Sequence, residues 1–400
     1  MDTLIHVDEA ETLVAAHLPA FGSERVPLGE AAGRILRQAV DAECDHPAFD
    51  RVMMDGIALR WRDPLPAVFT LAGAGLAGMA KAALPAQDAC IEVTTGAMLP
   101  SGCDCVVPVE QVRREGDRCL LADDCRPQRG QFIHARGSDC LAGTRVLGAG
   151  VRIGAPEVAQ LAANGVARVA VGVVPSVAIV ATGDELVAVD APLGEGQVRR
   201  SNDSAVAAAL RLHGMDRVSM GWVADELPAI EAMLEARLAG HEVLILSGGV
   251  SMGQRDHVPR ALAELGVRKV FHRIAQRPGK PMWFGIGPRG QLVFALPGNP
   301  VSALVCTVRY VRPALLAAMG LVPAQMEHAR LSAPMARHPA LTCFVPVRVH
   351  GDGQGSLLVR PMPTNTSGDF TALAGTQGFV QLPPGQGDAP AGTPLALYRW

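Results

Sequence analysis

The sequence predicts a multidomain protein of the α/β plus β class, built around a domain with a parallel sheet. Residues 176–320 alternate short apolar runs with helical patterns, an order that produces a parallel sheet covered by helices on both faces. Residues 44–136, and the segment from 327 onward, contain short apolar runs separated by turn signals, which is typical of small β domains. The 400 residues suffice for several domains at roughly 100–200 residues each.

The first 165 residues are predicted to be a helical region interrupted by a β unit. Asp8 is placed to cap a helix that runs through Leu18, and residues 28–40 have the pattern of a second helix. A helical pattern returns at 158–164, so we interpret the β unit as an insertion. Its strands are expected at 67–71, 90–94, 105–109 and 118–122.

In the α/β region, Asn202 or Asp203 is expected to cap the first helix, and Pro228 falls in the first turn of the second. Strands are predicted at 177–181, 218–223, 243–246 and 292–296, and helices at 205–212, 228–240 and 258–265. In the last segment, apolar runs at 344–349, 356–359, 378–382 and 395–398 predict a small β-barrel or sandwich.

Composition excludes several classes of protein. The net charge is −3 and no run of Lys or Arg stands out, which disfavours a nucleic-acid or anionic-membrane partner. The acidic N-terminus is unlike a signal peptide, and no uncharged apolar stretch of about 18 residues predicts a membrane span. Nine cysteines without a CxxC motif indicate reduced thiols, hence a cytoplasmic protein.

Three aspartates follow predicted strands of the α/β region. Asp184, Asp225 and Asp256 are separated by 41 and 31 residues, close to one β-α-β repeat each, which would bring them to one edge of the sheet. Grouped carboxylates suit Mg²⁺, which binds a few carboxylates together with substrate phosphates. Each Asp could also be a helix cap or turn residue, Asp225 most of all.

Two glycine-rich turns and one stiff basic loop occur in the same region. Glycines let backbone N–H groups approach an anion, and flanking prolines would hold a lysine in a fixed direction. Tight strand–helix turns and a solvated surface lysine are the ordinary alternatives. Together these segments predict a pocket for a phosphorylated organic ligand with a metal. They are Ser247-Gly248-Gly249-Val250-Ser251, Pro297-Gly298-Asn299-Pro300 and Arg277-Pro278-Gly279-Lys280-Pro281.

The first half has polar clusters of its own, Met54-Asp55-Gly56, Thr94-Thr95-Gly96-Ala97 and Arg136-Gly137-Ser138-Asp139. A hairpin or turn role accounts for each, and physical reasoning alone names no reaction for them.

These motifs, in this order, resemble the MoeA family of molybdopterin molybdenumtransferases, which is related to the E domain of gephyrin. The resemblance extends from about Leu28 to Trp400. It rests on Met54-Asp55-Gly56, Thr95-Gly96-Ala97, Arg136-Gly137, Thr182-Gly183-Asp184-Glu185, Ser247–Ser251 with Gly253 and Asp256, Pro278-Gly279-Lys280-Pro281, and Leu296-Pro297-Gly298-Asn299-Pro300-Val301-Ser302.

The resemblance implies an elongated homodimer of four-domain subunits. An elongated α/β linker domain would comprise residues 1–45 and 135–172, with a small β domain inserted at 46–134. The molybdopterin-binding α/β domain would cover 173–326, and the C-terminal β-barrel 327–400.

The reaction implied is molybdate-dependent cleavage of adenylylated molybdopterin, which releases AMP and leaves molybdenum on the dithiolene. Molybdate would be a substrate, Mg²⁺ would assist, and the upstream adenylylating protein would be a partner. The region of Asp55, Thr95 and Arg136 would complete the cleft of the other subunit, with Asp55 as an acid–base or molybdate-site residue.

By this resemblance the catalytic residues are Asp55, Asp184, Asp225, Asp256 and Lys280, and the metal ligands Asp55, Glu185, Asp225 and Asp256. The substrate-binding residues are Thr95, Gly96, Arg136, Thr182, Gly183, Glu185, Ser247, Gly248, Gly249, Val250, Ser251, Arg277, Gly279, Pro297, Gly298, Asn299 and Ser302.

Three positions depart from the family pattern. Arg51-Val52-Met53 replaces small or polar residues before the Met-Asp-Gly motif, and Arg277 stands where lysine is common. Pro346 stands where the last domain often has an arginine, although Arg348 is near. A tungstate-selective paralogue, a non-catalytic molybdopterin-binding scaffold and an enzyme that adenylylates molybdopterin are the alternative functions.

Overall fold

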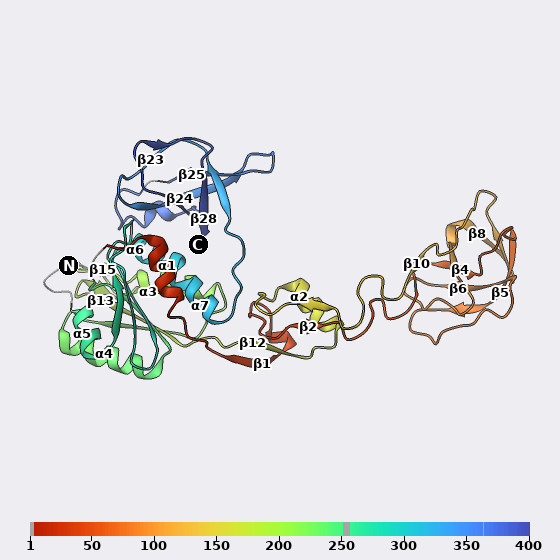
Figure 1. Cartoon of the computed structure of the whole chain (residues 1–400), viewed down its shortest axis with the longest axis horizontal. Coiled ribbons are helices and arrows are strands. Elements are labelled where there is room, and N and C mark those ends of the chain that lie inside the picture. The colour runs from red at the N-terminus through yellow and green to blue at the C-terminus, as the bar shows by residue number, and fades with distance from the viewer. Residues whose placement is uncertain (1–3, 251–256, 363) are drawn as a thin grey trace. The chain divides into compact units, whose positions relative to one another are not determined.

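The computed structural model describes residues 4–250, 257–362 and 364–400, and its elements are traced in Figure 1. The chain divides into two compact units with separate hydrophobic cores. We call them the main unit (Met1–Arg37, Ala149–Gly154 and Arg168–Trp400) and the small unit (Gln38–Gly148 and Ala155–Ala167).

The main unit contains a six-stranded sheet that is only partly parallel. Its order is β16 (Val218–Val223), β13 (Val177–Thr182), β17 (Val243–Ser247), β21 (Leu292–Leu296), β20 (Trp283–Ile286) and β18 (Arg268–His272). The first four are parallel, as predicted. The expectation of a wholly parallel sheet is wrong at one edge, where β20 and β18 are antiparallel. β18 carries charged residues and does not read as an apolar run, whereas β20 is apolar but only four residues long.

Helices cover both faces of this sheet, which is why every residue of β13 and β17 is buried. One face packs against α1 (Val7–Ala15), α3 (Asn202–Arg211), α6 (Pro300–Cys306) and α7 (Arg312–Ala318). The other face packs against α4 (Leu227–Gly240), whose Pro228 lies in the first turn as predicted, and α5 (Val258–Glu264).

A π-helical segment, η3 (Thr307–Val311), joins α6 to α7. By length and composition the continuous stretch Pro300–Ala318 could cross a bilayer, but 78% of its most apolar window is buried inside the protein. Its apolar side chains belong to the core that includes the central sheet.

The last segment forms a closed five-stranded barrel, which decides between the barrel and the sandwich. Around the barrel the strands are β24 (Thr342–Gly351), β25 (Leu357–Pro361), β22 (His328–Leu331), β28 (Pro394–Arg399) and β26 (Gly378–Leu382), which returns to β24. A short strand that precedes the Lys280 loop, β19 (Gln276–Arg277), pairs with β24. A further pair, β23 (Met335–Ala336) with β27 (Asp388–Ala389), and the 3-10 turn η4 (Thr371–Leu373) complete this region.

The helix predicted at 28–40 is wrong. Only a 3-10 turn forms, η1 (Leu28–Glu30), and the backbone N–H groups of Gly33 and Leu36 then donate to carbonyls of Ile153 and Val151. Pairing with a distant segment has overridden the local helical pattern. Nearby, β1 (Ser23–Pro27) and β12 (Arg168–Gly172) pair in the main unit.

The capping predictions are also wrong. Asp8 lies inside the first turn of α1, where His6 is the N-cap, and α3 begins after Ser201 without a side-chain cap. Asn202 is therefore available for another contact, described below.

The small unit contains the predicted β domain. Its sheet has the order β7 (Cys105–Pro108), β4 (Gly56–Leu59), β6 (Ala89–Val93), β5 (Val68–Gly75), β9 (Arg118–Leu121) and β8 (Val112–Glu115), with the turn η2 (Val109–Gln111) before β8. Two short ladders pair β3 (Arg51–Val52) with β10 (Ile133–His134), and β2 (Val40–Asp41) with β11 (Arg145–Leu147). The helix predicted at 158–164 is present as α2 (Ala155–Ala163).

Candidate active site

The polar loops predicted at strand ends in the α/β sheet do lie side by side. The register aligns Thr182 with Val223, and Ser247 with Leu296, so the loops that follow these strands leave the sheet at one edge. The backbone N–H of Asp225 donates to Asp184 Oδ1 at 3.0 Å. These two predicted site residues are therefore neighbours, as their spacing in the sequence indicated.

Two further predicted residues belong to the same edge. A Cβ added to Gly183 would lie 2.6 Å from Glu185 Oε2, so the Glu185 carboxylate folds over this glycine. The carbonyl of Val250 contacts the His272 ring at 3.2 Å. Ser251 and Asp256 lie outside the described residues.

The two glycine-rich turns approach each other closely. Gly248 has a φ of +105°, and a Cβ there would lie 2.5 Å from the carbonyl oxygen of Thr182. A Cβ added to Gly298 would lie 3.6 Å from the Cα of Gly248. Only glycine fits at position 248, where the backbone is buried and its N–H donates to the Leu296 carbonyl, whereas Gly298 is exposed. We call the place where these two turns meet, at the end of the sheet, the glycine cradle, a type of turn that suits an anion.

Asn202 joins these two turns. Its Nδ2 donates to Ser247 Oγ at 2.8 Å and to the carbonyl of Gly298 at 2.7 Å. Asn202 Oδ1 and Thr182 Oγ1 are buried and have no hydrogen-bond partner among the described residues. Because buried polar atoms are normally paired, both are candidate ligand contacts. Sequence reasoning gave Asn202 only a capping role.

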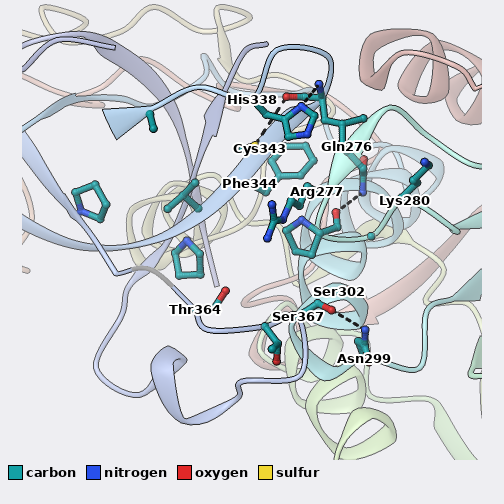
Figure 2. A pocket seen from close by; sticks show the side chains of 18 of the residues that line it. Gln276, Arg277, Lys280, Asn299, Ser302, His338, Cys343, Phe344, Thr364 and Ser367 are labelled. Carbon is teal, nitrogen blue, oxygen red and sulfur yellow. Dashed lines mark hydrogen bonds between the residues drawn. The ribbon is translucent and has the colours of Figure 1, made fainter. Parts of the chain in front are cut away.

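A cavity of about 1010 Å³ lies in the main unit between the Lys280 loop and the barrel. Figure 2 shows Arg277, Lys280 and Ser302 on one side of it and His338 and Thr364 from the barrel segment. The predicted residues Arg277, Gly279, Lys280, Pro297, Asn299 and Ser302 line it, together with Gln276, Pro278, Pro281, 334–339, Leu341, 343–346, Pro361 and 364–367.

The cavity lining is cationic. Arg277, Lys280 and Arg337 belong to it, and no Asp or Glu occurs among its described lining residues. Arg337 Nε is buried without a hydrogen-bond partner. Guanidinium and ammonium groups that gather without a carboxylate favour an anionic ligand, and arginine binds oxyanions through a planar pair of N–H groups.

His338 adds a neutral donor to this lining. The backbone N–H groups of Ala340 and Leu341 donate to His338 Nδ1 at 3.1 and 3.0 Å. Nδ1 is therefore the acceptor nitrogen, which leaves the proton of the neutral ring on Nε2.

The connection between β25 and β26, which includes residues 364–367, is held at Ser367 against the start of α6. Asn299 Nδ2 donates to Ser367 Oγ at 2.6 Å, and the Val301 N–H donates to the Ser367 carbonyl at 3.1 Å. Sequence reasoning missed this segment and the pair Arg337–His338. The basic pair between Pro334 and Pro339, and the run of small polar residues from 364 to 368, were the available signals.

A buried relay supports the loop that carries Arg277 and Lys280. Tyr310, in the π-helical segment, donates to Gln276 Oε1 at 2.5 Å, and Gln276 Nε2 donates to the Pro278 carbonyl at 3.1 Å. Burial raises the pKa of Tyr310 well above its ordinary value, so the phenol stays a donor. Through these two hydrogen bonds, the π-helical segment η3 helps to position Arg277 and Lys280.

In the small unit, Asp55 accepts hydrogen bonds from the backbone N–H of Thr95 at 2.6 Å and from its hydroxyl at 2.7 Å. These two hydrogen bonds hold the pKa of Asp55 below its ordinary value, and the bond from the backbone N–H has the larger effect. Thr95 and Gly96 both line a cavity of about 300 Å³ in this unit. Arg136 is held instead by Asp45, at 2.7 Å, and through its backbone by Asp50.

Family profiles match most of the chain. The MoeA N-terminal region (domain I and II) matches residues 5–165, a probable molybdopterin-binding domain matches 178–317, and the MoeA C-terminal region (domain IV) matches 328–400.

Full-length relatives agree with these profiles. The molybdopterin molybdenumtransferase of Synechocystis sp. is 35% identical over 99% of this chain and 100% of its own length. That of Bacillus subtilis is 33% identical over 96% and 91%. The structure of the MoeA protein of molybdopterin biosynthesis from Pyrococcus horikoshii is 26% identical, covers 100% of both chains and has a TM-score of 0.83. The chain therefore belongs to the MoeA family of enzymes, the molybdopterin molybdenumtransferases.

Proposed function

We propose that this enzyme inserts molybdenum from molybdate into adenylylated molybdopterin and releases AMP. The observation that carries the proposal is the large cationic cavity, free of acidic residues among its described lining, next to the glycine cradle. A small oxyanion and a phosphorylated organic ligand would each find matching groups there. The molybdopterin molybdenumtransferase relatives support the choice of substrates.

The residues divide the work by their chemistry. The turns at Gly248 and Gly298, with the unpartnered hydroxyl of Thr182, would bind the phosphate part of the substrate. Asn202 Oδ1 can only accept a hydrogen bond, so it would bind an O–H or N–H group of the organic part. Arg277, Lys280 and Arg337 would bind molybdate and stabilise the charge that develops when the pyrophosphate bond breaks. Arg337 would supply the basic group of the last domain in place of Arg348, which is not among the described residues that line the cavity.

The described carboxylates near the glycine cradle could bind Mg²⁺ only together with oxygen atoms of the substrate. Among the described residues, no group of three His, Cys, Asp or Glu side chains could hold a metal by itself. Asp184 and its neighbour Asp225 provide hard oxygen ligands, and Mg²⁺ commonly takes one or two carboxylates plus substrate phosphates. These two residues would hold the ion together with the substrate phosphates, whose charge the ion would neutralise. The roles of Asp55, Glu185 and Asp256 as ligands stay predictions.

We further propose the homodimer and the four domains with the boundaries given above, with Asp55, Thr95 and Arg136 completing the partner's cleft. The ionised state of Asp55 supports a role as a base or fixed anion over one as an acid. Contact with the adenylylating protein and a cytoplasmic location remain predictions.

AMP release by the purified chain, with Mg²⁺ and adenylylated molybdopterin, tests the function when molybdate and tungstate are titrated separately. We expect release at low molybdate. Lys280→Gln should raise the KM for molybdate roughly tenfold or more, because a charge-assisted contact is lost. Lys81→Gln, an exposed lysine of the small unit, is the control.

The alternatives predict different results. A response to tungstate alone indicates the tungstate-selective paralogue, and tight adenylate binding without release under either oxyanion indicates the scaffold. Turnover of molybdopterin and ATP without any need for molybdate indicates the adenylylating enzyme, and would refute the proposal.

Tyr310→Phe should weaken oxyanion use although Tyr310 does not line the cavity. The change leaves Gln276 Oε1 buried and unpaired, which costs roughly 1–3 kcal/mol, and it frees the Arg277–Lys280 loop. We expect the molybdate KM to rise roughly three- to tenfold with kcat nearly unchanged. Tyr398→Phe is a matched control, since Tyr398 also donates to a glutamine, Gln381, but within the barrel. Equal effects of both variants on KM would refute the positioning role.

A further inference from the structure

The segment Arg51-Val52-Met53 departs from the family pattern, and in the small unit it forms one wall of a separate cavity. Strands β3 and β10 pair so that Arg51 lies directly opposite His134, and Val52 opposite Ile133. Val52 is buried, so its alternating neighbour Arg51 is turned to the exposed face of this ladder. The cross-strand pair therefore brings the guanidinium and the imidazole together.

A chain of hydrogen bonds orients the guanidinium. His134 Nε2 donates to Asp139 Oδ1 at 2.7 Å, and Arg51 Nη2 donates to His134 Nδ1 at 3.0 Å. Arginine has no acceptor, so Nδ1 must carry the lone pair, and the carboxylate then selects the tautomer with its proton on Nε2. Asp139 and His134 thus hold Arg51 in one direction without neutralising it directly. Among the described residues Arg51 forms no ion pair.

The cavity beside this guanidinium has the size and chemistry for a small anion. It measures about 300 Å³ and is lined by Arg51, Val52, Met53, Thr95, Gly96 and His134, none of them acidic. That volume corresponds to roughly ten water molecules at about 30 Å³ each, enough for a tetrahedral oxyanion with part of its hydration shell. Thr95 connects the cavity to the Asp55 carboxylate, to which it donates twice.

We propose that Arg51, positioned by His134 and Asp139, binds a tetrahedral oxyanion in this cavity. The small unit then carries an oxyanion subsite of its own, separate from the large cavity of the main unit. The choice of oxyanion rests on the proposed function, which offers two sources, free molybdate and the phosphate of the adenylylated substrate. In either case Arg51 would help select the substrate that Asp55 meets.

The test is oxyanion binding by the full chain in a background where the large cavity has lost its charge. In the triple variant Arg277→Gln, Lys280→Gln, Arg337→Gln, the ligands molybdate, tungstate and AMP are titrated separately by equilibrium dialysis and calorimetry. We expect molybdate and tungstate to keep one class of site in this background, and AMP to keep a second one at the glycine cradle. Arg51→Gln should weaken the site in the small unit roughly tenfold or more, since a charge-assisted contact is removed. Loss of molybdate affinity identifies the free oxyanion as the ligand, and loss of AMP affinity identifies the phosphate.

Two further variants separate binding from structure. Arg113→Gln removes an exposed arginine of the same unit that pairs with Glu115, and should leave the affinity unchanged. Asp139→Asn should weaken binding less than Arg51→Gln does, and should change the ¹⁵N shifts of the His134 ring, which report its tautomer. Unchanged affinity for every ligand in Arg51→Gln would overturn the proposal. Because binding is measured without turnover, a lack of AMP release would count against the proposed function and leave this subsite standing.

Discussion

Replacing Gly248 by alanine is expected to reduce AMP release by roughly 100-fold or more, the loss typical of removing preorganised anion contacts. The new Cβ would lie 2.5 Å from the carbonyl oxygen and 2.8 Å from the hydroxyl of Thr182. Since Thr182 ends the buried strand β13, it cannot yield easily, and the turn must move away. The cradle that faces Gly298 would then open.

The control is another glycine with a similar backbone. Gly290 has a φ of +84°, but a Cβ there meets no atom within 4 Å. Gly290→Ala therefore carries the same left-handed backbone cost, roughly 1–2 kcal/mol, without the clash. We expect this variant to keep its activity and to lose stability only. If both alanine variants lost activity equally, backbone strain would explain the loss and the anion cradle would be refuted.

The sequence was sufficient to predict those parts of the site that lie in loops directly after parallel strands. Asp184 and Asp225 follow parallel strands, whose geometry fixes where their loops meet, so their adjacency could be inferred. Four strands in each of the three regions with strands were predicted, because an apolar run bounded by turns indicates a buried strand. Strands β4, β8, β18, β20 and β22 were not predicted.

What the sequence could not provide depends on contacts between distant segments. Arg337 and His338 reach the cavity only because β19 pairs with β24 and sets the barrel beside the Lys280 loop. Asn202 bridges two turns 45 and 96 residues away, which no local pattern encodes. The absent helix at 28–40 has the same origin, since its backbone pairs with residues 151–153.

Asp55→Asn is expected to lower kcat roughly 100- to 1000-fold while the protein stays folded, in line with the loss of a general base. Asparagine keeps the shape of the side chain and an oxygen that can accept from Thr95, so the local structure should survive. Because hydrogen bonds lower the pKa of Asp55, the carboxylate is ionised throughout the neutral range, and activity should not fall with Asp55 protonation between pH 8 and about pH 5. Asp88→Asn, at an exposed position of the same unit, is the control.

The same variant also tests the proposed dimer. If each cleft needs Asp184 from one subunit and Asp55 from the other, a mixed dimer of Asp55→Asn and Asp184→Asn chains contains one intact cleft. Equal mixing makes half of the dimers mixed, so two inactive proteins should together recover about a quarter of the wild-type activity. The mixture must be unfolded and refolded together, and each variant refolded alone must stay inactive. No recovery, with mixed dimers demonstrated by differential tags, would mean that Asp55 acts within its own subunit or not in the reaction at all. Recovery would establish that the two chains share their clefts, because no arrangement within a single chain can restore activity to a pair of such variants.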